Sequence, residues 1–452
     1  MINSNLKFYK KATSIDEIDN AVRLNVPVTP EHEFYTDFSD VRGDFEDRMV
    51  YQSLNVHPKT FVFNREINQN NKVILFLAGM RGSGKTSELA KIANKLNNKD
   101  CFFCVTCNLD DGLDLNDMEY MDILIFQIER LFQELDARDI DIDKDIIDDL
   151  QKWFGQRVEE VNKSIKSEGG FQVDIDAKTP SFFSFLSITA KLKANLTGSK
   201  ENSDKIRTVF RNNFTDFSLK FNSFVEAVNM QLRRKNIAKE VIFIVDGLEK
   251  AFTASTRRRI IIEESNRIRQ IKVHTIFTLP IELLSEEQVL GAFSTVISFP
   301  FVKLKEKDET IIEKAILRFE EFIYKRIDAS LFDSNETVRK AILYGGGSPR
   351  ELLRILEYAN MYSDEDSDKI YLADLEKGIK KLASKTAHYL TADDLAKLKT
   401  LKEANEKGDS LPFGEDWQRL LENLIVFEYN DGTYKRVNPI VEESALYKQY
   451  VG

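Results

Sequence analysis

Short apolar runs separated by longer amphipathic stretches predict a chain in which strands alternate with helices. Apolar residues recur at helical spacing in several intervening stretches, such as Met118–Leu135. Because strands that alternate with helices build parallel sheets, we expect an α/β fold with helices on both faces of the sheet. The predicted strands are Val73–Leu77, Cys101–Thr106, Glu240–Val245, Thr275–Thr278 and Thr295–Phe299.

Beyond residue 300 the pattern becomes helical, and it ends in two short strand-like runs. These runs, Leu424–Tyr429 and Tyr434–Val437, flank Asn430-Asp431-Gly432, which is a hairpin signal. Between the second and third strands lies a long charged region, mostly helical in pattern, with one alternating stretch at Phe171–Ala177. The predicted parts are an N-terminal helical and linker segment at 1–70, a core at 71–300 with a helical insertion at about 140–238, a helical segment at 301–388 and a C-terminal domain at 389–452.

The first predicted strand runs directly into a glycine-rich turn that matches the phosphate-loop pattern, Gly79-Met80-Arg81-Gly82-Ser83-Gly84-Lys85-Thr86. Backbone N–H groups of such a turn wrap an anionic phosphate, and the helix that follows points its positive end at the same group. Lys85 is expected to reach the β- and γ-phosphates of a nucleotide, and Thr86 to offer its hydroxyl to Mg²⁺. The alternative is a glycine-rich turn without a ligand. The expected nucleotide-binding residues are Gly79, Arg81, Gly82, Ser83, Gly84, Lys85, Thr86 and Ser87.

Two more strand ends carry polar residues that belong beside this loop. The third strand ends in Asp246, and an aspartate in this place holds Mg²⁺ through water in phosphate-loop ATPases. Thr278 ends the fourth strand, where a polar residue is expected to touch the γ-phosphate or position the attacking water. Because parallel strands bring their carboxyl ends to one edge, these residues should gather there. Thr86 and Asp246 are therefore the expected metal ligands, and a plain turn residue is the alternative for Asp246.

A sharp helix start follows Gly345-Gly346-Gly347. Ser348 suits the N-cap, Pro349 suits the first turn, and Glu351 would complete a capping box. This start would present Arg350 near the sheet, where an arginine can sense the γ-phosphate. An ordinary surface arginine is the alternative.

Composition narrows the class of protein. The 452 residues are 42% hydrophobic and 31% charged, which is typical of a globular protein, and no apolar run approaches ~18 residues. With no apolar signal core at the N-terminus either, we expect a cytoplasmic protein without a membrane span. Cys101 and Cys107 should face one side of their strand and Cys104 the other. We therefore predict buried hydrophobic side chains and no zinc or iron–sulfur cluster.

The net charge of −10 hides two opposite runs. Residues 110–149 hold 15 acidic and 3 basic side chains, whereas residues 191–239 hold 11 basic and 4 acidic ones. The two runs either pair with each other, or the basic run meets nucleic acid. Residues 377–452 hold 12 basic and 12 acidic side chains, so the C-terminal domain lacks the basic footprint of a DNA reader.

Taken together, these signatures resemble P-loop ATPases of the AAA+ and STAND types, most closely the branch shared with origin-recognition proteins. The resemblance covers roughly residues 45–451 and implies a P-loop NTPase sheet followed by a helical lid and a winged-helix domain. It places Val245–Lys250 in the second nucleotide signature, Thr278 in the sensor-one place and Gly347–Arg350 in the sensor-two motif. It also implies that the N-terminal segment closes over the base of the nucleotide.

Two features depart from that family. Many members place a catalytic glutamate directly after the metal aspartate, but Gly247 stands there, and Glu249 is the substitute on offer. No arginine stands out as a finger that acts on a neighbouring subunit. The candidates are Arg257, Arg258, Arg259, Arg267 and Arg269.

The resemblance implies an ATP- and Mg²⁺-binding, slowly hydrolysing ATPase that switches conformation and assembles with a protein partner in bacterial defence or signalling. Its catalytic residues would be Lys85, Asp246, Glu249, Thr278 and Arg350. A DNA-associated ATPase of the replication-initiation or transposition-regulator type is the alternative, with the basic run or the winged helix as its nucleic-acid contact. A homo-oligomer stays open, and a metabolic kinase fits the C-terminal half poorly.

Overall fold

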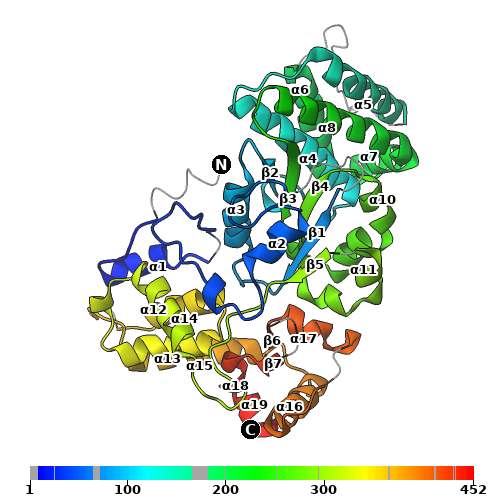
Figure 1. Cartoon of the computed structure of the whole chain (residues 1–452). Helices are drawn as coiled ribbons and strands as arrows, with labels where there is room; N and C mark the ends of the chain where they lie inside the picture. Colours follow the sequence, from blue (N-terminus) through cyan, green and yellow to red (C-terminus); the bar gives the residue numbers. More distant parts are fainter. Residues whose placement is uncertain are drawn as a thin grey trace.

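The computed structural model shows a central sheet flanked by helices, with further helices and a hairpin at its lower edge (Figure 1). In Figure 1 the described helices of the charged insertion lie above the sheet, and the C-terminal helices and hairpin lie below it. The structure describes residues 9–24, 26–64, 72–164, 182–198, 200–251, 253–293, 295–364, 367–411, 414–430, 432 and 434–452. The strand expected at Phe171–Ala177 lies outside these residues.

All five strands of the central sheet, within the described chain, are parallel. Their order is β2-β3-β4-β1-β5, so β1 lies between β4 and β5. The register places Thr278 beside Leu77 and Asp246 beside Asn108, which brings the carboxyl ends to one edge. The strands are β1 (Ile74–Gly79), β2 (Phe102–Asn108), β3 (Glu240–Asp246), β4 (His274–Pro280) and β5 (Thr295–Ser298).

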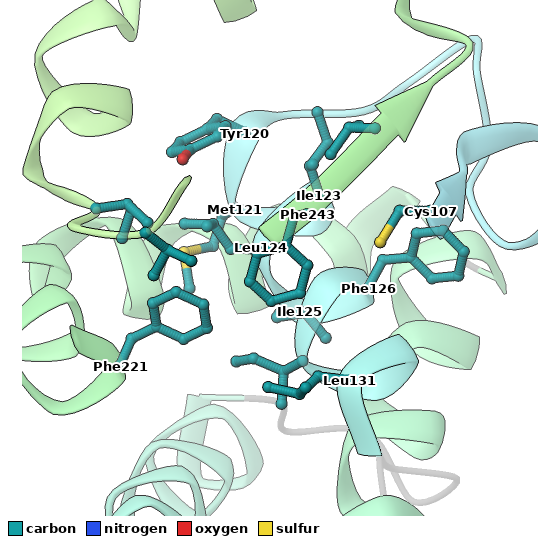
Figure 2. Packing of buried hydrophobic residues seen from close by; sticks show 14 of the residues in the cluster. Cys107, Tyr120, Met121, Ile123, Leu124, Ile125, Phe126, Leu131, Phe221 and Phe243 are labelled. Atoms are coloured by element: carbon teal, nitrogen blue, oxygen red, sulfur yellow. The ribbon is translucent and has the colours of Figure 1, made fainter. Parts of the chain in front are cut away.

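Alternate residues of each strand enter two separate cores, because successive side chains in a strand point to opposite faces. Leu75, Ile242 and Ile276 pack with α2 (Asp47–Ser53) and α3 (Lys85–Leu96). Phe243 and Cys107 enter the larger core on the other face, where Figure 2 shows Phe243 beside α4 (Tyr120–Ala137). The helices that share this larger core are α5 (Lys144–Ser164), α6 (Phe182–Gly198), α7 (Lys200–Asn212), α8 (Phe214–Arg234), α10 (Ser265–Gln270) and α11 (Glu287–Ala292).

The opposite charge runs pair with each other across the helices of this face. Arg207 of α7 is buried and donates to both carboxylate oxygens of Asp122 on α4, at 3.3 and 3.0 Å from its Nε. Further ion pairs join the same two runs. They are Arg207–Asp117 at 2.9 Å, Lys193–Glu129 at 2.8 Å, Arg211–Glu119 at 3.1 Å and Lys220–Asp149 at 2.7 Å.

We call residues 301–388 the lid. Its helices are α12 (Glu313–Tyr324), α13 (Asn335–Gly345), α14 (Pro349–Met361) and α15 (Leu372–Ala387). Ala12, Ile18 and Phe38 of the N-terminal segment belong to the core of these helices, whereas Phe45 and Val50 belong to the α3 side of the sheet. The N-terminal segment therefore spans the lid and the sheet.

We call residues 389–452 the C-terminal module. Its strands β6 (Val426–Tyr429) and β7 (Tyr434–Val437) form the antiparallel hairpin that the sequence predicts. A separate apolar core holds the module together and also includes Met80, Ile281 and Phe301 from outside it. Its helices are α16 (Ala392–Lys407), α17 (Gln418–Glu422), α18 (Pro439–Glu442) and α19 (Ala445–Tyr450). Whether this arrangement is a winged helix stays a prediction.

The predicted fold class, a parallel α/β sheet with helices on both faces followed by a helical region, is confirmed. Two details differ. The sequence predicts a first helix near Ser14–Leu24, but α1 (Ile18–Ala21) is much shorter, with a 3₁₀ turn at Ile15–Glu17 before it. Cys101 packs on the α3 side with Cys104, not with Cys107, because it precedes β2 and its N–H closes a turn to the carbonyl of Asn98.

Candidate functional site

A cavity of about 700 Å³ lies where the N-terminal segment, the carboxyl edge of the sheet and the lid meet. The phosphate loop, β2 and β3 edge residues and α14 supply most of its polar wall, and the N-terminal segment supplies most of its apolar wall. Polar and charged side chains on it are Tyr35, Thr36, Arg42, Arg81, Lys85, Thr86, Ser87, Glu88, Asn108, Asp110, Asp111, Glu249, Lys250, Arg326 and Arg350. Apolar residues on it are Leu24, Val26, Pro27, Val28, Phe34, Phe38, Leu115, Phe322, Pro349 and Leu353.

The phosphate loop has the geometry that an anion requires. Gly84 takes a left-handed conformation at φ 95° and acts as the N-cap of α3, so the free N–H groups of this helix start open toward the cavity. Gly82 is also left-handed, at φ 84°, and a Cβ there would lie 2.8 Å from the Cβ of Arg350. Only glycine therefore allows the lid to approach the loop this closely.

Lys85 is turned back onto its own loop. Its ammonium donates to the carbonyl oxygens of Gly79 at 2.8 Å and Met80 at 2.9 Å, and lies 3.5 Å from Glu249 Oε1. These three contacts use the donors of the ammonium, so Lys85 must leave them to reach a phosphate.

Thr86 and Asp246 are brought together as the sequence predicts. The Thr86 hydroxyl donates to Asp246 Oδ2 at 2.6 Å, while the buried Oδ1 has no hydrogen-bond donor among the described residues. Burial, and then the negative charge of Glu249, raise the pKa of Asp246 to about 6. A buried carboxylate oxygen without a partner fits a position that can contact a cation.

Three further buried oxygens near this edge also lack partners in the described chain. They are Ser83 Oγ, Asn108 Oδ1 and Glu249 Oε2. Oxygen ligands of this kind suit Mg²⁺, which takes one or two protein ligands and completes its shell with water and phosphate oxygens. No group of three or more His, Cys, Asp or Glu side chains that could hold a metal occurs among the described residues. The set therefore fits Mg²⁺ that arrives with a nucleotide, held by Thr86 and Asp246.

Glu249 and Thr278 form one buried unit behind the cavity wall. The Thr278 hydroxyl accepts the N–H groups of Gly247 at 3.0 Å and Leu248 at 3.3 Å, and it also bonds to Glu249. Burial acts to raise the pKa of Glu249, but the charge of Lys85 and the Thr278 hydroxyl outweigh it and hold that pKa below its usual value. Glu249 reaches the cavity wall, whereas Thr278 does not. Direct contact of Thr278 with a phosphate stays a prediction.

Arg350 reaches the cavity from the lid. Ser348 caps α14 by accepting the N–H of Glu351 at 3.3 Å, and its hydroxyl lies 3.4 Å from the carbonyl oxygen of Gly82. The expected capping box is only half formed, because the Ser348 N–H bonds to Gly345 instead and the Glu351 carboxylate pairs with Arg354 at 3.4 Å. Burial, and then the neighbouring Arg81, lower the pKa of Arg350, so this end of the cavity concentrates positive charge.

Arg42 is a site residue that the sequence reasoning missed. Its guanidinium is 3% exposed, donates to the Pro300 carbonyl at 2.7 Å and lies 4.0 Å from the centre of the Phe299 ring. A Cβ at Gly84 would lie 3.8 Å from its Nη2. Its Nε has no acceptor and no carboxylate lies within ion-pair distance, among the described residues. Burial lowers its pKa to about 10. A single arginine before the loop gave no local signal of this role.

The arginines considered as fingers are all engaged within the chain. Arg257 is buried and pairs with Glu282 and Glu422, and Arg258 pairs with Glu286. The remaining contacts are Arg259 to the Met118 carbonyl, Arg267 to Glu264 and Arg269 to Asn266.

The three cysteines are buried and free. Burial raises the pKa of the Cys101 thiol to about 12 and raises those of Cys104 and Cys107 further, which keeps all three protonated. The absence of bound zinc stays a prediction.

Among the described residues, no helix has the length and apolar character needed to cross a membrane.

No protein-family model matches the sequence, and no curated protein matches it. Among solved structures, the chain is similar to a Walker-type ATPase of Pyrococcus abyssi, with 13% identity and a TM-score of 0.40 over 93% of this chain and 98% of that one. It is also similar to the RuvB Holliday junction branch migration motor of Thermotoga maritima, with 10% identity and a TM-score of 0.34 over 92% and 98%. Both similarities are distant, so the chemistry of the cavity follows from its own residues.

Proposed function

We propose that this protein binds ATP with Mg²⁺ in the cavity and hydrolyses it slowly, and that the nucleotide sets the position of the lid. The observation that carries the proposal is the convergence of the phosphate loop, Thr86 and Arg350 on one cavity, with Asp246 hydrogen-bonded to Thr86. The polar wall suits a triphosphate, and the apolar wall from the N-terminal segment and the lid suits a base.

Binding begins at the start of α3. Phosphate oxygens accept N–H groups of the loop, and Lys85 exchanges the Gly79 and Met80 carbonyls for phosphate oxygens. Arg42 and Arg350 neutralise further negative charge from the N-terminal segment and from the lid. Bound Mg²⁺ would supply charge neutralisation at the β- and γ-phosphates.

Glu249 is the residue that would promote hydrolysis. Glu249 lines the cavity and its Oε2 has no partner among the described residues, so this carboxylate is the group available to orient a water for in-line attack. A carboxylate with a lowered pKa accepts a proton weakly, so turnover is expected to be slow. Departure of Lys85 toward the phosphate would remove one cause of that lowered pKa. Thr278 positions Glu249 through its hydroxyl.

The output is assembly with a protein partner, in a defence or signalling setting. Internal pairing of charges supports this reading, because four of the eleven basic side chains of the run pair with the acidic run and three more pair with other acidic side chains. The DNA-associated alternative predicts retention of duplex or single-stranded DNA at low salt, with a steep loss as salt rises. Failure to retain either form supports the switch.

Calorimetric titration of ATP with Mg²⁺ into the Lys85→Ala variant tests the proposal. We expect affinity to fall by roughly tenfold to a hundredfold or more, because a charged donor to two phosphates is lost. Lys99→Ala is the matched control, because Lys99 is exposed and lies beyond the end of α3. This variant should bind ATP with the same affinity as the unchanged chain. Equal affinity in the Lys85 variant contradicts the proposal.

A further inference from the structure

We propose that the C-terminal module regulates nucleotide affinity by holding Met80 of the phosphate loop, so that docking of the module and binding of nucleotide oppose each other. This inference rests on the proposed nucleotide site and names a regulator of it. In this proposal the C-terminal module acts as an internal inhibitor of the nucleotide site.

Met80 leaves the phosphate loop on the side away from the cavity. Its side chain is 1% exposed and belongs to the apolar core of the module, together with Phe301, Val426 and Phe427. Its sulfur accepts the backbone N–H of Glu428 on β6 at 3.2 Å. A residue inside the nucleotide loop is thus part of the core of another module, which a loop that only bound phosphate would not need.

The other end of Met80 holds the withdrawn lysine. Its carbonyl oxygen accepts Lys85 Nζ at 2.9 Å and the N–H of Ser83 at 3.3 Å. When Lys85 moves to a phosphate, this carbonyl loses its charged donor, and the peptide that carries it must adjust. A docked module fixes the Met80 side chain and so stabilises the loop conformation in which Lys85 is withdrawn.

The same strand of the module contacts the turn that carries the lid arginine. Tyr429 Oη donates to the carbonyl of Gly346 at 2.7 Å, and a Cβ at Gly346 would lie 2.7 Å from the Phe427 ring. Three residues later α14 begins, with Arg350 packed over Gly82. Strand β6 therefore touches both parts that must move when a nucleotide is held between loop and lid.

Arg257 fastens the module to the core at a second place. It is 2% exposed, donates to the Ala251 carbonyl at 2.6 Å and lies 2.9 Å from Glu282 Oε1 of the core. It also pairs with Glu422 of α17, whose carboxylate is partly exposed. Loss of the Glu422 charge leaves Arg257 paired with Glu282, so the core keeps its ion pair while the module loses its latch.

The test measures the affinity of a slowly hydrolysed ATP analogue with Mg²⁺ in a chain that carries Glu422→Gln and Tyr429→Phe. Coupling between two sites is typically at least fivefold, so we expect the Kd to fall by about fivefold to tenfold. The matched control carries Glu403→Gln and Tyr450→Phe, whose side chains are exposed on the same module, and its Kd should be unchanged. Unchanged or weaker affinity in the folded double variant overturns the inference.

A measurement on the unchanged chain makes the test independent of variants. Coupling is reciprocal, so the nucleotide must weaken the docking of the module. Hydrogen exchange at the Glu428 amide, which bonds to Met80, should become faster when the analogue is bound. Equal or slower exchange overturns the inference. If the unchanged chain binds no nucleotide at all, the proposed function fails; if it binds and neither measurement responds, only the regulation fails.

Discussion

At the scale of single residues, the cavity is defined by polar atoms that lack partners. Asp246 Oδ1, Glu249 Oε2 and Arg42 Nε are buried and unpaired in the described chain. Glu249 and Arg42 line the cavity, and Asp246 is hydrogen-bonded to Thr86 of its wall. Buried polar groups normally find a hydrogen-bond partner, because leaving one unpaired costs about 1–3 kcal/mol. Other unpaired atoms, such as Arg157 Nε and Arg259 Nε, lie elsewhere in the described chain, but beside the phosphate loop unpaired atoms of both signs of charge occur together, which suits an ionic ligand.

Asp246→Asn tests the metal end of the cavity. The variant should bind nucleotide within about twofold of the unchanged chain, since the aspartate acts through the metal and not on the base or ribose. Mg²⁺-dependent hydrolysis should fall by roughly a hundredfold, because the carboxylate charge that holds the metal is lost. Turnover is measured by phosphate release across Mg²⁺ concentrations. Unchanged turnover would leave Asp246 with a structural role alone.

Arg42→Met tests the residue that only the structure revealed. Methionine keeps the length and packing of the side chain but removes its charge and donors, so affinity for ATP should fall by roughly tenfold. Affinity for adenosine, which has no phosphate, should stay the same. Calorimetry with ATP and with adenosine distinguishes a role in phosphate binding from a role in supporting the cavity wall. Arg23→Met, at an exposed position, is the control. An equal loss for adenosine would show that Arg42 supports the cavity wall and not the phosphates.

At the scale of elements, the helices of the insertion are tied to α4 by charge as well as by apolar packing. Arg207 of α7 reaches Asp122 and Asp117, and both it and Asp122 are 2% exposed. Burial raises the pKa of Asp122 to about 6 even though Arg207 lowers it. The buried carboxylate of Asp122 therefore depends on Arg207, because without the arginine it has neither water nor a cation to stabilise its charge.

Arg207→Met should destabilise the fold by about 3–5 kcal/mol at neutral pH, since it leaves Asp122 buried without its cation. The raised pKa of Asp122 means that the folded state binds a proton more tightly than the unfolded state. Stability contributed by protonated Asp122 is therefore present at low pH and lost as the pH rises through about 6. In the variant the pKa of Asp122 is higher still, because Arg207 no longer lowers it, so the deficit should shrink as the pH falls toward about 6, which urea unfolding at several pH values would measure. A pH-independent deficit would contradict this account.

The exposed pair Lys220–Asp149 supplies the control for that experiment. Both side chains are open to solvent, at 35% and 68% exposure, so Lys220→Met should change stability little at any pH.

At the scale of the whole molecule, three bodies meet at one loop. The lid approaches Gly82 from the cavity side, the C-terminal module holds Met80 from behind, and the N-terminal segment places Arg42 beside Gly84. A ligand that rearranges the loop would therefore shift contacts with all three. This arrangement supports a switch, in which a change of nucleotide alters the positions of the domains.

Arg350→Ala should uncouple the state of the nucleotide from the arrangement of the lid. A contact between its guanidinium and the γ-phosphate would tie the lid to the sheet only when ATP is bound, because ADP lacks that group. The variant should bind ADP about as well as the unchanged chain and lose the ATP-specific compaction. Small-angle scattering and limited proteolysis, with ATP and with ADP, measure the difference.

Arg354→Ala is the control, because Arg354 lies on the same helix and pairs with Glu351. If the Arg350 variant keeps the full difference between ATP and ADP, Arg350 is not the sensor. If the unchanged chain shows no difference between ATP and ADP, the switch itself is contradicted and the result favours the DNA-associated alternative.

The sequence by itself determined the features that depend on neighbours along the chain. The strand–loop–helix around Gly84, the aspartate at the end of β3 and the Ser348 cap of α14 each follow from local spacing. Glycine conformations, caps and alternation are set by a few consecutive residues, so their pattern can be recognised without the fold. The meeting of Thr86 with Asp246 was also predictable, because parallel strands align their carboxyl ends.

The tertiary structure alone decided which distant residues share a site. Arg42 lies beside Gly84, Met80 lies in the core of a module nearly 350 positions away, and Arg257 pairs with Glu282 of the core and Glu422 of the C-terminal module. The local sequence pattern predicted none of these three contacts, because an arginine or a methionine has no characteristic spacing when its partners are far along the chain. It also misplaced Cys101, whose side follows from the turn before β2 and not from alternation. Periodicity describes an element, whereas a site depends on how the elements pack.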